Sequence, residues 1–150
     1  MRIYKFVLVI VFVLSCAKEE KKACDFDPEI CSAIETLKLN RDNWTSLNID
    51  SYTMDLNIVC FCVFQEPYSI TVINNSVASI SGNEDWGYEG LPVTINSLFK
   101  EIEERIYENP FYFNIKYDEE FGFPKSSSFD MVEIIADEEI SYIISNFNKN

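Results

Sequence analysis

Residues 52–64 read YTMDLNIVCFCVF, and this stretch decides the fold class of the chain. Apolar side chains recur at every second position from Tyr52 onward, which is the period of a β-strand with one buried face. Beyond Asn57 both faces become apolar, so we expect the second half of the strand to be covered on both sides, with Phe61 in the core. The stretch also places two cysteines on one face of the strand, Cys60 and Cys62.

Helical and strand periods alternate along the rest of the chain. An apolar stripe predicts a helix over 29–47, with Pro28 in its first turn and Asp27 as its cap. A second stripe predicts a helix that is capped by Thr94 and stopped by Pro110. Further strands are expected at 68–73, 76–81, 111–117, 129–136 and 140–147, with a tight turn at Asn74-Asn75, a loop over 82–92, a turn-rich connection over 118–128 and a hairpin tip at 137–139.

This order, a helix and three strands followed by a helix and three strands, predicts an α+β domain. We expect one antiparallel sheet of about six strands, a common size, with both helices on one face. The order is compatible with two copies of one α-β-β-β unit.

The first residues have the layout of a lipoprotein signal peptide. Arg2 and Lys5 precede an apolar run that ends in a small residue before Cys16. We expect residues 1–15 to be removed and acyl chains such as palmitate on Cys16 to anchor the chain to a membrane; an ordinary cleaved signal is the alternative. Residues 16–23 then form a charged tether and 24–150 one folded domain.

This layout predicts a protein of the cell envelope, held at the outer membrane by its lipid. The residues directly after Cys16 include Lys18-Glu19-Glu20, which resembles a surface-export signal of bacterial lipoproteins. The cell surface is therefore the alternative location.

The chain is strongly acidic, with a formal net charge of −13 that becomes −15 when residues 1–15 and their two basic side chains are removed. Such a charge argues against nucleic acid as a partner. Besides the membrane, we expect an unknown protein or small-molecule ligand, and a monomeric chain.

Cysteine chemistry is the first candidate for function. Beyond Cys16 the chain has an even number of cysteines, Cys24, Cys31, Cys60 and Cys62, which in an exported domain predicts disulfides. Successive residues on one face of a strand lie about 6.6–6.8 Å apart, at the upper limit for a disulfide, so a direct Cys60–Cys62 bond requires a kinked strand. Pairing these two with Cys24 and Cys31 avoids that strain. The chain lacks histidine, and we expect neither a metal nor a cofactor.

Enzyme chemistry has little support, because the usual general base, histidine, is absent. We therefore expect a non-enzymatic binding or envelope-associated module. The alternatives are an inhibitor-like protein that grips its partner with the open sheet face or the loop at Trp86, and a hydrolase that uses carboxylates, with candidates Asp118, Glu119, Glu120, Asp137, Glu138 and Glu139.

Two segments are candidates for binding. Trp86 and Tyr88 lie in a glycine-bearing loop and would form an aromatic platform unless Trp86 folds back over the second helix. Tyr117-Asp118, followed by Gly122-Phe123-Pro124, has the chemistry of a rigid turn, and a binding role is the alternative.

The pattern over residues 44–147 resembles a family of uncharacterised bacterial secreted proteins and lipoproteins. The residues that carry the resemblance are Trp44, Tyr52, Cys60-x-Cys62, a strand near 70–72, Thr94-Ile95-x-x-Leu98-Phe99 and Tyr117-Asp118-x-x-x-Gly122-Phe123-Pro124. The resemblance implies a location and a fold type but no activity. Because its pattern includes Cys60 and Cys62 but neither Cys24 nor Cys31, it implies a local Cys60–Cys62 pair and a separate short loop closed by the other two.

Overall fold

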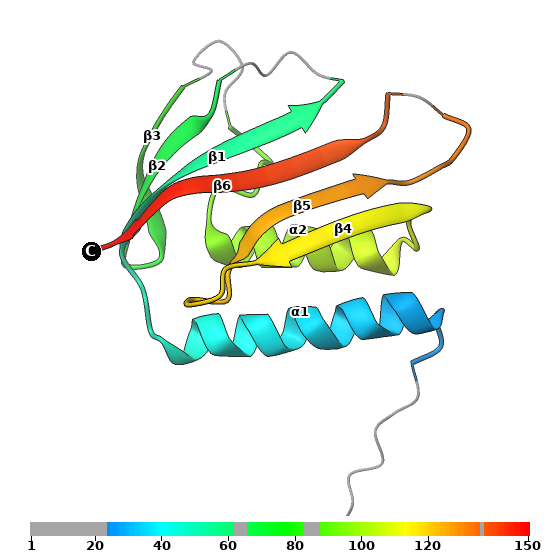
Figure 1. Ribbon diagram of the computed structural model, residues 1–150. Helices are drawn as coiled ribbons and strands as arrows, with labels where there is room; N and C mark the ends of the chain where they lie inside the picture. The colour runs from blue at the N-terminus through cyan, green and yellow to red at the C-terminus, as the bar shows by residue number, and fades with distance from the viewer. Residues whose placement is uncertain (1–23, 62–65, 83–87, 136) are drawn as a thin grey trace, which may run out of the picture.

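The computed structural model describes residues 24–61, 66–82, 88–135 and 137–150. Two helices, α1 (Pro28–Ser46) and α2 (Ile95–Tyr107), lie on the same side of one antiparallel sheet (Figure 1). The strands are β1 (Tyr52–Cys60), β2 (Tyr68–Ile73), β3 (Ser76–Ser81), β4 (Tyr112–Tyr117), β5 (Pro124–Asp130) and β6 (Ile140–Lys149). Their order across the sheet is β3-β2-β1-β6-β5-β4. The predicted α+β fold and its α-β-β-β-α-β-β-β order are confirmed.

The core lies between the sheet and the helices. Every second residue of β1 from Tyr52 to Ile58 is buried, as the alternation predicts. The stripe of α2 is buried throughout, with Ile95, Leu98, Phe99, Ile102 and Ile106 at most 1% exposed. The longer α1 buries only one residue in every seven, Ile30, Leu37 and Trp44, so most of its surface stays in contact with solvent.

The helix ends and the first hairpin follow their local sequence. Thr94 Oγ1 accepts a hydrogen bond from the Ser97 N–H at 3.0 Å, and Ser97 Oγ accepts one from the Thr94 N–H at 2.8 Å, so the predicted cap is confirmed. Asp27, in contrast, precedes α1 without a side-chain capping bond. The Asn74-Asn75 turn is also confirmed, with both residues in the left-handed region at φ 51° and 60°.

The expected two-sided cover of β1 is wrong. Val59 is 51% exposed and Phe61 is 80% exposed, because the helices cover only one face of the sheet and the other face is open. The strand ends at Cys60, and residues 62–64 of the predicted stretch, which include Cys62, lie outside the described residues.

The expected connection over 118–128 is also wrong, because β5 begins within it at Pro124. The Ser-rich sequence of β5 gives little strand signal of its own, but it pairs with β4 on one side and β6 on the other. The first strand of the closing hairpin, predicted over 129–136, therefore ends earlier than predicted. β5 ends at Asp130, and the loop from 131 to 139 joins it to β6.

The described part of the chain begins at Cys24. The proposed signal peptide and the whole tether, including Cys16, lie outside the described residues. Among the helices that are described, none is long and apolar enough to cross a membrane.

Candidate functional site

The outer edge of β4 is an unpaired sheet edge beside α1. β4 is the last strand of the sheet and, among the described strands, pairs only with β5. Alternate residues of an edge strand direct their N–H and C=O groups away from the sheet, where they can pair with another chain. The sequence of β4, YFNIKY, is rich in aromatic and β-branched residues, and Lys116 is its only charged residue. β4 therefore presents a strand edge with good β-forming side chains.

A groove follows this edge between α1 and β4. One part, of about 380 Å³, is lined on the helix side by Ser32, Ala33 and Thr36 and on the strand side by Phe113, Asn114, Ile115 and Tyr117. A second part, of about 540 Å³, lies at the start of α1. The two parts share Glu29 and Phe113, so they form one continuous depression, the α1–β4 groove.

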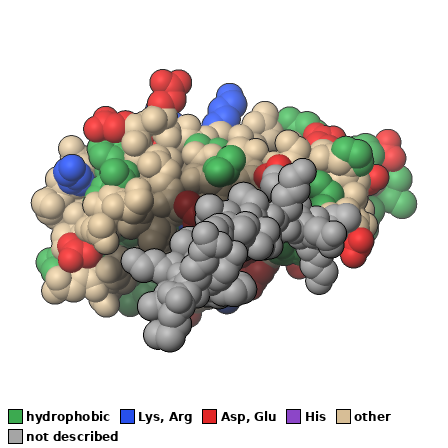
Figure 2. All heavy atoms as spheres, turned by 90° about the horizontal axis from the view of Figure 1, so that it is seen from below, with side chains coloured by type: hydrophobic (Ala, Val, Ile, Leu, Met, Phe, Trp, Pro, Cys, Tyr) green, Lys and Arg blue, Asp and Glu red, His purple; other side chains and the backbone are tan. Residues whose placement is uncertain are grey.

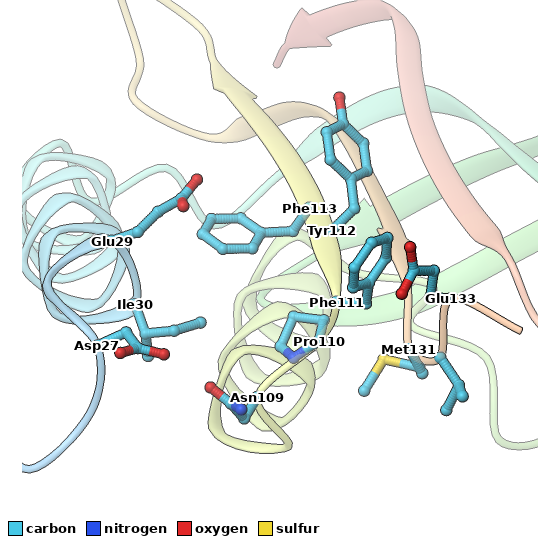
Figure 3. A pocket seen from close by; sticks show the side chains of 11 residues that line it. Asp27, Glu29, Ile30, Asn109, Pro110, Phe111, Tyr112, Phe113, Met131 and Glu133 are labelled. Atoms are coloured by element: carbon cyan, nitrogen blue, oxygen red, sulfur yellow. The ribbon is translucent and has the colours of Figure 1, made fainter.

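The wide end of the α1–β4 groove combines an apolar floor with an acidic border (Figure 3). Asp27, just before α1, and Glu29 in its first turn border it on one side, and Glu133 borders it from the β5–β6 loop, while Pro110, Phe111, Phe113 and Met131 lie between them. All three acidic residues are solvent-exposed. The described lining of the groove includes no lysine or arginine. The groove therefore suits a ligand with positive charge and apolar surface.

A disulfide holds the start of α1 at this end of the molecule. Cys24 and Cys31 are bonded, with their Cα atoms 5.8 Å apart, and close a loop that precedes and enters the helix. Within that loop the ring of Phe26 packs on Tyr107 at the end of α2, with ring centroids 5.8 Å apart. The acidic residues at the start of α1 are thereby fixed beside the wide end of the groove.

This disulfide excludes the pairing of Cys24 and Cys31 with the two cysteines of the first strand. The separate short loop that the resemblance implies is present instead. Cys60 is also disulfide-bonded. Cys62, its expected partner in the local pairing, lies outside the described residues.

The Tyr117-Asp118 segment forms a rigid turn at the other end of β4. Asp118 Oδ1 accepts hydrogen bonds from two later N–H groups of the turn, at 3.0 and 2.9 Å, and the Asp118 N–H donates to Phe123 O at 2.8 Å. Gly122 has a φ of 77°, and a Cβ there would lie 2.8 Å from Asn43 Nδ2 and 2.9 Å from Asn40 O. The turn therefore packs tightly on α1 and fixes the distance between helix and strand.

Phe123 anchors that turn in the core. It is 3% exposed, and its ring centroid lies 4.6 Å from that of Phe147 and 6.2 Å from that of Trp44. These contacts explain why an aromatic residue follows the glycine, and they support the structural interpretation of the segment.

Tyr117 lies where the turn and the groove meet. Its ring stacks on Phe99, with centroids 6.4 Å apart, and its hydroxyl has no hydrogen-bond partner among the described protein atoms. Burial raises the pKa of Tyr117 well above its usual value, although the nearby Arg41 opposes the shift. Of the predicted binding residues that the structure describes, Tyr117 alone lines the α1–β4 groove.

The other candidates lie elsewhere. Tyr88 is 42% exposed, and Trp86 lies outside the described residues. Asp118 lines a hollow on the far side of the hairpin. The acidic residues at 137–139 occupy the β5–β6 loop, as expected, where the Asp137 N–H donates to Glu139 Oε2 at 3.2 Å. Across the described part of the chain, no three potential ligands gather to hold a metal ion.

Sequence reasoning missed most of the groove. Glu29 and Phe113 were placed on a helix and a strand, but periodicity does not say which strand forms the edge or which helix lies beside it. A lysine within an aromatic strand is the one local signal of an edge, and Lys116 provides it.

The chain belongs to a family of unknown function, DUF6174, whose profile matches residues 36–149. No curated protein and no solved structure shows a significant match. The matched region includes the whole sheet, α2 and the later part of α1. The disulfide loop and Glu29 lie before it, so they are features of this chain outside the matched region.

Proposed function

We propose that this DUF6174 chain is a lipid-anchored, non-enzymatic binding module of the cell envelope, and that it takes an extended, basic segment of another protein into the α1–β4 groove. The signal-peptide layout that ends at Cys16 supports the anchor. The unpaired edge of β4 beside a groove is the observation that carries the binding role.

Strand addition is the binding mode that this edge favours. An extended segment that lies along β4 gains main-chain hydrogen bonds, and its alternate side chains point to opposite faces of the extended sheet. Those on the helix side would contact Ala33, Phe113 and Ile115, which line the groove. Backbone pairing would supply affinity, and the groove would select side chains that fit beside α1.

Charge determines the class of ligand. The wide end of the groove is bordered by Asp27, Glu29 and Glu133, and the whole chain carries a formal net charge of −13. A segment with lysine or arginine would be attracted toward this end and would approach faster at low ionic strength. An acidic segment of the same length would be repelled.

The exposure of these carboxylates favours binding over hydrolysis. A general acid needs a carboxyl group whose protonated form is stabilised, usually by an apolar and dry environment. Asp27, Glu29 and Glu133 are all solvent-exposed, which suits a role as counter-charges for a basic ligand.

The open face of the sheet gives less support to the inhibitor-like alternative. Its outward-facing positions are mainly small and polar, and they include Thr53, Asn57, Thr71, Ser79, Ser128 and Ser145. Interface energy is usually concentrated in large aromatic and arginine side chains, which these six positions lack, although Tyr112 and Ile143 are exposed on the same face.

A pair of synthetic peptides tests the proposal. We would titrate the full chain into fluorescein-labelled peptides of alternating lysine and valine or of alternating glutamate and valine, and measure fluorescence anisotropy. The lysine peptide is expected to bind and the glutamate peptide is not. Equal binding of both peptides, or no binding of the lysine peptide, would contradict the proposal.

Two variant pairs locate the site. Ser32→Trp fills the groove at an exposed position and should weaken binding by at least about tenfold, while Leu39→Trp, also exposed on α1 but outside the groove lining, should not. Glu29→Lys should weaken binding more than Glu119→Lys, which makes the same change in net charge at the far end of β4. If the two variants of each pair weaken peptide binding equally, the peptide binds outside the α1–β4 groove.

A further inference from the structure

Large apolar side chains are exposed together at one end of the molecule. In the β5–β6 loop, Ile134 is 88% exposed and Ile135 is 52% exposed. Val132 in the same loop, Phe61 after β1 and Phe111 before β4 are also exposed. We call these five residues the apolar tip. They gather because Cys60 pairs with Ile140 and Tyr112 pairs with Asp130, so the end of β1 and the start of β4 lie beside the two ends of the loop.

The described chain also begins at this end. Val132 and Glu133 share the wide end of the groove with Asp27 and Glu29, which lie within the loop closed by the Cys24–Cys31 disulfide. In Figure 1 the start of α1 and the β5–β6 loop lie at the same, right-hand end. Figure 2, seen from below, shows hydrophobic and acidic side chains side by side there.

The length of the tether limits how far this end can move from a lipid on Cys16. Eight Cα–Cα steps separate Cys16 from Cys24 and span at most about 28 Å when fully extended. α1 alone is about 28 Å long and runs away from this end. An anchored chain would therefore hold the apolar tip closer to the membrane, on average, than the opposite end of the molecule.

We infer that the apolar tip docks on a zwitterionic lipid bilayer, an inference that rests on the proposed lipid anchor at Cys16. Ile134, Ile135 and Phe61 enter the boundary between head groups and acyl chains, where aliphatic and aromatic side chains leave water. Phe111 and Val132 belong both to the tip and to the wide end of the α1–β4 groove. The part of the groove lined by Ser32 and Ile115 contains no tip residue and stays open to a partner near the membrane.

Charge selects the kind of lipid surface. Glu133, Asp137 and Glu139 are exposed in the loop that carries the two isoleucines. Anionic head groups would repel these carboxylates within a Debye length, about 8 Å at physiological salt, whereas zwitterionic head groups would not. Docking should therefore weaken when anionic lipid is added.

Tryptophan quenching tests the docking in the full, lipidated chain. We would reconstitute Ile134→Trp and Leu39→Trp proteins in phosphatidylcholine vesicles with brominated acyl chains and subtract the emission of the unsubstituted protein, which has the same two native tryptophans. Both sites are strongly exposed, 88% and 70%, so neither substitution should disturb folding. The emission at 134 should fall by about half and the emission at 39 should not change.

Each outcome separates docking from anchoring. Quenching at 134 that decreases when phosphatidylglycerol replaces part of the phosphatidylcholine supports docking. If the protein floats with the vesicles but tryptophan 134 is not quenched, docking is overturned and the anchor stands. A blue shift without quenching at 134 indicates that a second copy covers the tip, which also overturns lipid docking. If the protein does not float with the vesicles, the anchor itself is contradicted.

Discussion

The two halves of the sheet bury different chemistry. In the half formed by β1, β2 and β3, the core-facing residues of the first two strands are apolar or aromatic: Tyr52, Met54, Leu56, Ile58, Tyr68, Ile70 and Val72. In the half formed by β4, β5 and β6, Phe129 and Ile144 share the inner face with Ser127, Tyr117 and Tyr142. Both inner faces contain tyrosine hydroxyls: in the first half Tyr52 OH accepts a hydrogen bond from the Ile95 N–H at 3.0 Å, and the second half adds the buried Ser127 hydroxyl.

Those hydroxyls differ in how well they are satisfied. Tyr142 donates to Glu101 at 2.8 Å, and Arg105 donates to Glu101 at 2.8 Å and to Tyr142 at 3.2 Å, which closes a network between α2 and β6. The hydroxyls of Tyr117 and Ser127 have no partner among the described protein atoms. Both halves end in an edge strand, but the half with unpartnered buried hydroxyls and an aromatic edge strand beside a groove is the more suitable place for a ligand.

Among the substitutions that compare the two halves of the sheet, one in the turn that supports β4 should lower stability the most. Gly122→Ala forces a side chain into a φ of 77° and against Asn40 and Asn43, so it should lower the free energy of unfolding by about 3 kcal/mol. Gly90→Ala is the matched control: its φ is 83° but its Cβ would meet nothing within 4 Å, so it should cost only about 1 kcal/mol. Urea denaturation measures both. Equal losses of unfolding free energy for the two variants would show that the packing of the turn on α1 contributes nothing to stability.

Removing the hydroxyl groups of the two core tyrosines of the second half should have different effects on stability. Tyr142→Phe leaves Glu101 and Arg105 without a partner hydroxyl and should destabilise the chain by about 2 kcal/mol. Tyr117→Phe removes an unpartnered hydroxyl and should change stability by less than about 0.5 kcal/mol, or increase it. Denaturation near pH 7 separates them, and a larger loss for Tyr117→Phe would contradict the assignment.

Tyr117 should also make the second half sensitive to alkali. Burial raises its pKa, so above about pH 10 the unfolded chain releases the tyrosine proton before the folded chain does. Stability should be unaffected below that pH and should fall as the pH rises above it. By pH 11 the fall should be about 1 kcal/mol smaller for Tyr117→Phe than for the unsubstituted chain. Parallel falls for the two proteins would exclude a buried, neutral Tyr117.

The smallest predicted effect concerns association of the chain with itself through the two edge strands, β4 and β3. Lys116 is the only charged residue of β4, and charge on an edge strand discourages pairing between copies. Lys116→Val should increase the association constant of the chain with itself by about threefold, equal to about 0.7 kcal/mol. Ser79→Val on β3, most of whose residues have small side chains, should have no measurable effect on self-association. Sedimentation velocity distinguishes these outcomes, and association through β3 would reverse the comparison.

The local periodicity of apolar residues was sufficient to predict most of the helices and strands. The alternation in β1, the stripe of α2 with its Thr94 cap and the Asn74-Asn75 turn each specify a structure within a few residues, and each is confirmed. β5 was missed because its strand conformation depends on two neighbours rather than on its own serines. Val59 and Phe61 were assigned to the core because apolar residues on both faces were interpreted as burial.

The candidate site was less accessible to prediction. Tyr117 was identified from turn chemistry, but the α1–β4 groove exists because β4 is the last strand and α1 lies beside it. Any lateral order of these strands satisfies the same alternation, so the edge cannot be read from a pattern of period two. Glu29 and Ser32 lie far from β4 in sequence, and tertiary packing, including that of the turn at Gly122 on α1, brings the two elements together.

Backbone amide exchange tests the central claim most directly, because it reports where an extended segment pairs with the sheet. The full chain would be exposed to deuterium with and without the alternating lysine–valine peptide, and exchange would be followed for β4 (Tyr112–Tyr117) and β3 (Ser76–Ser81). Strand addition predicts that the peptide slows exchange in β4 and leaves β3 unchanged. Binding of the peptide without protection of β4, or with protection of β3 instead, would contradict the account.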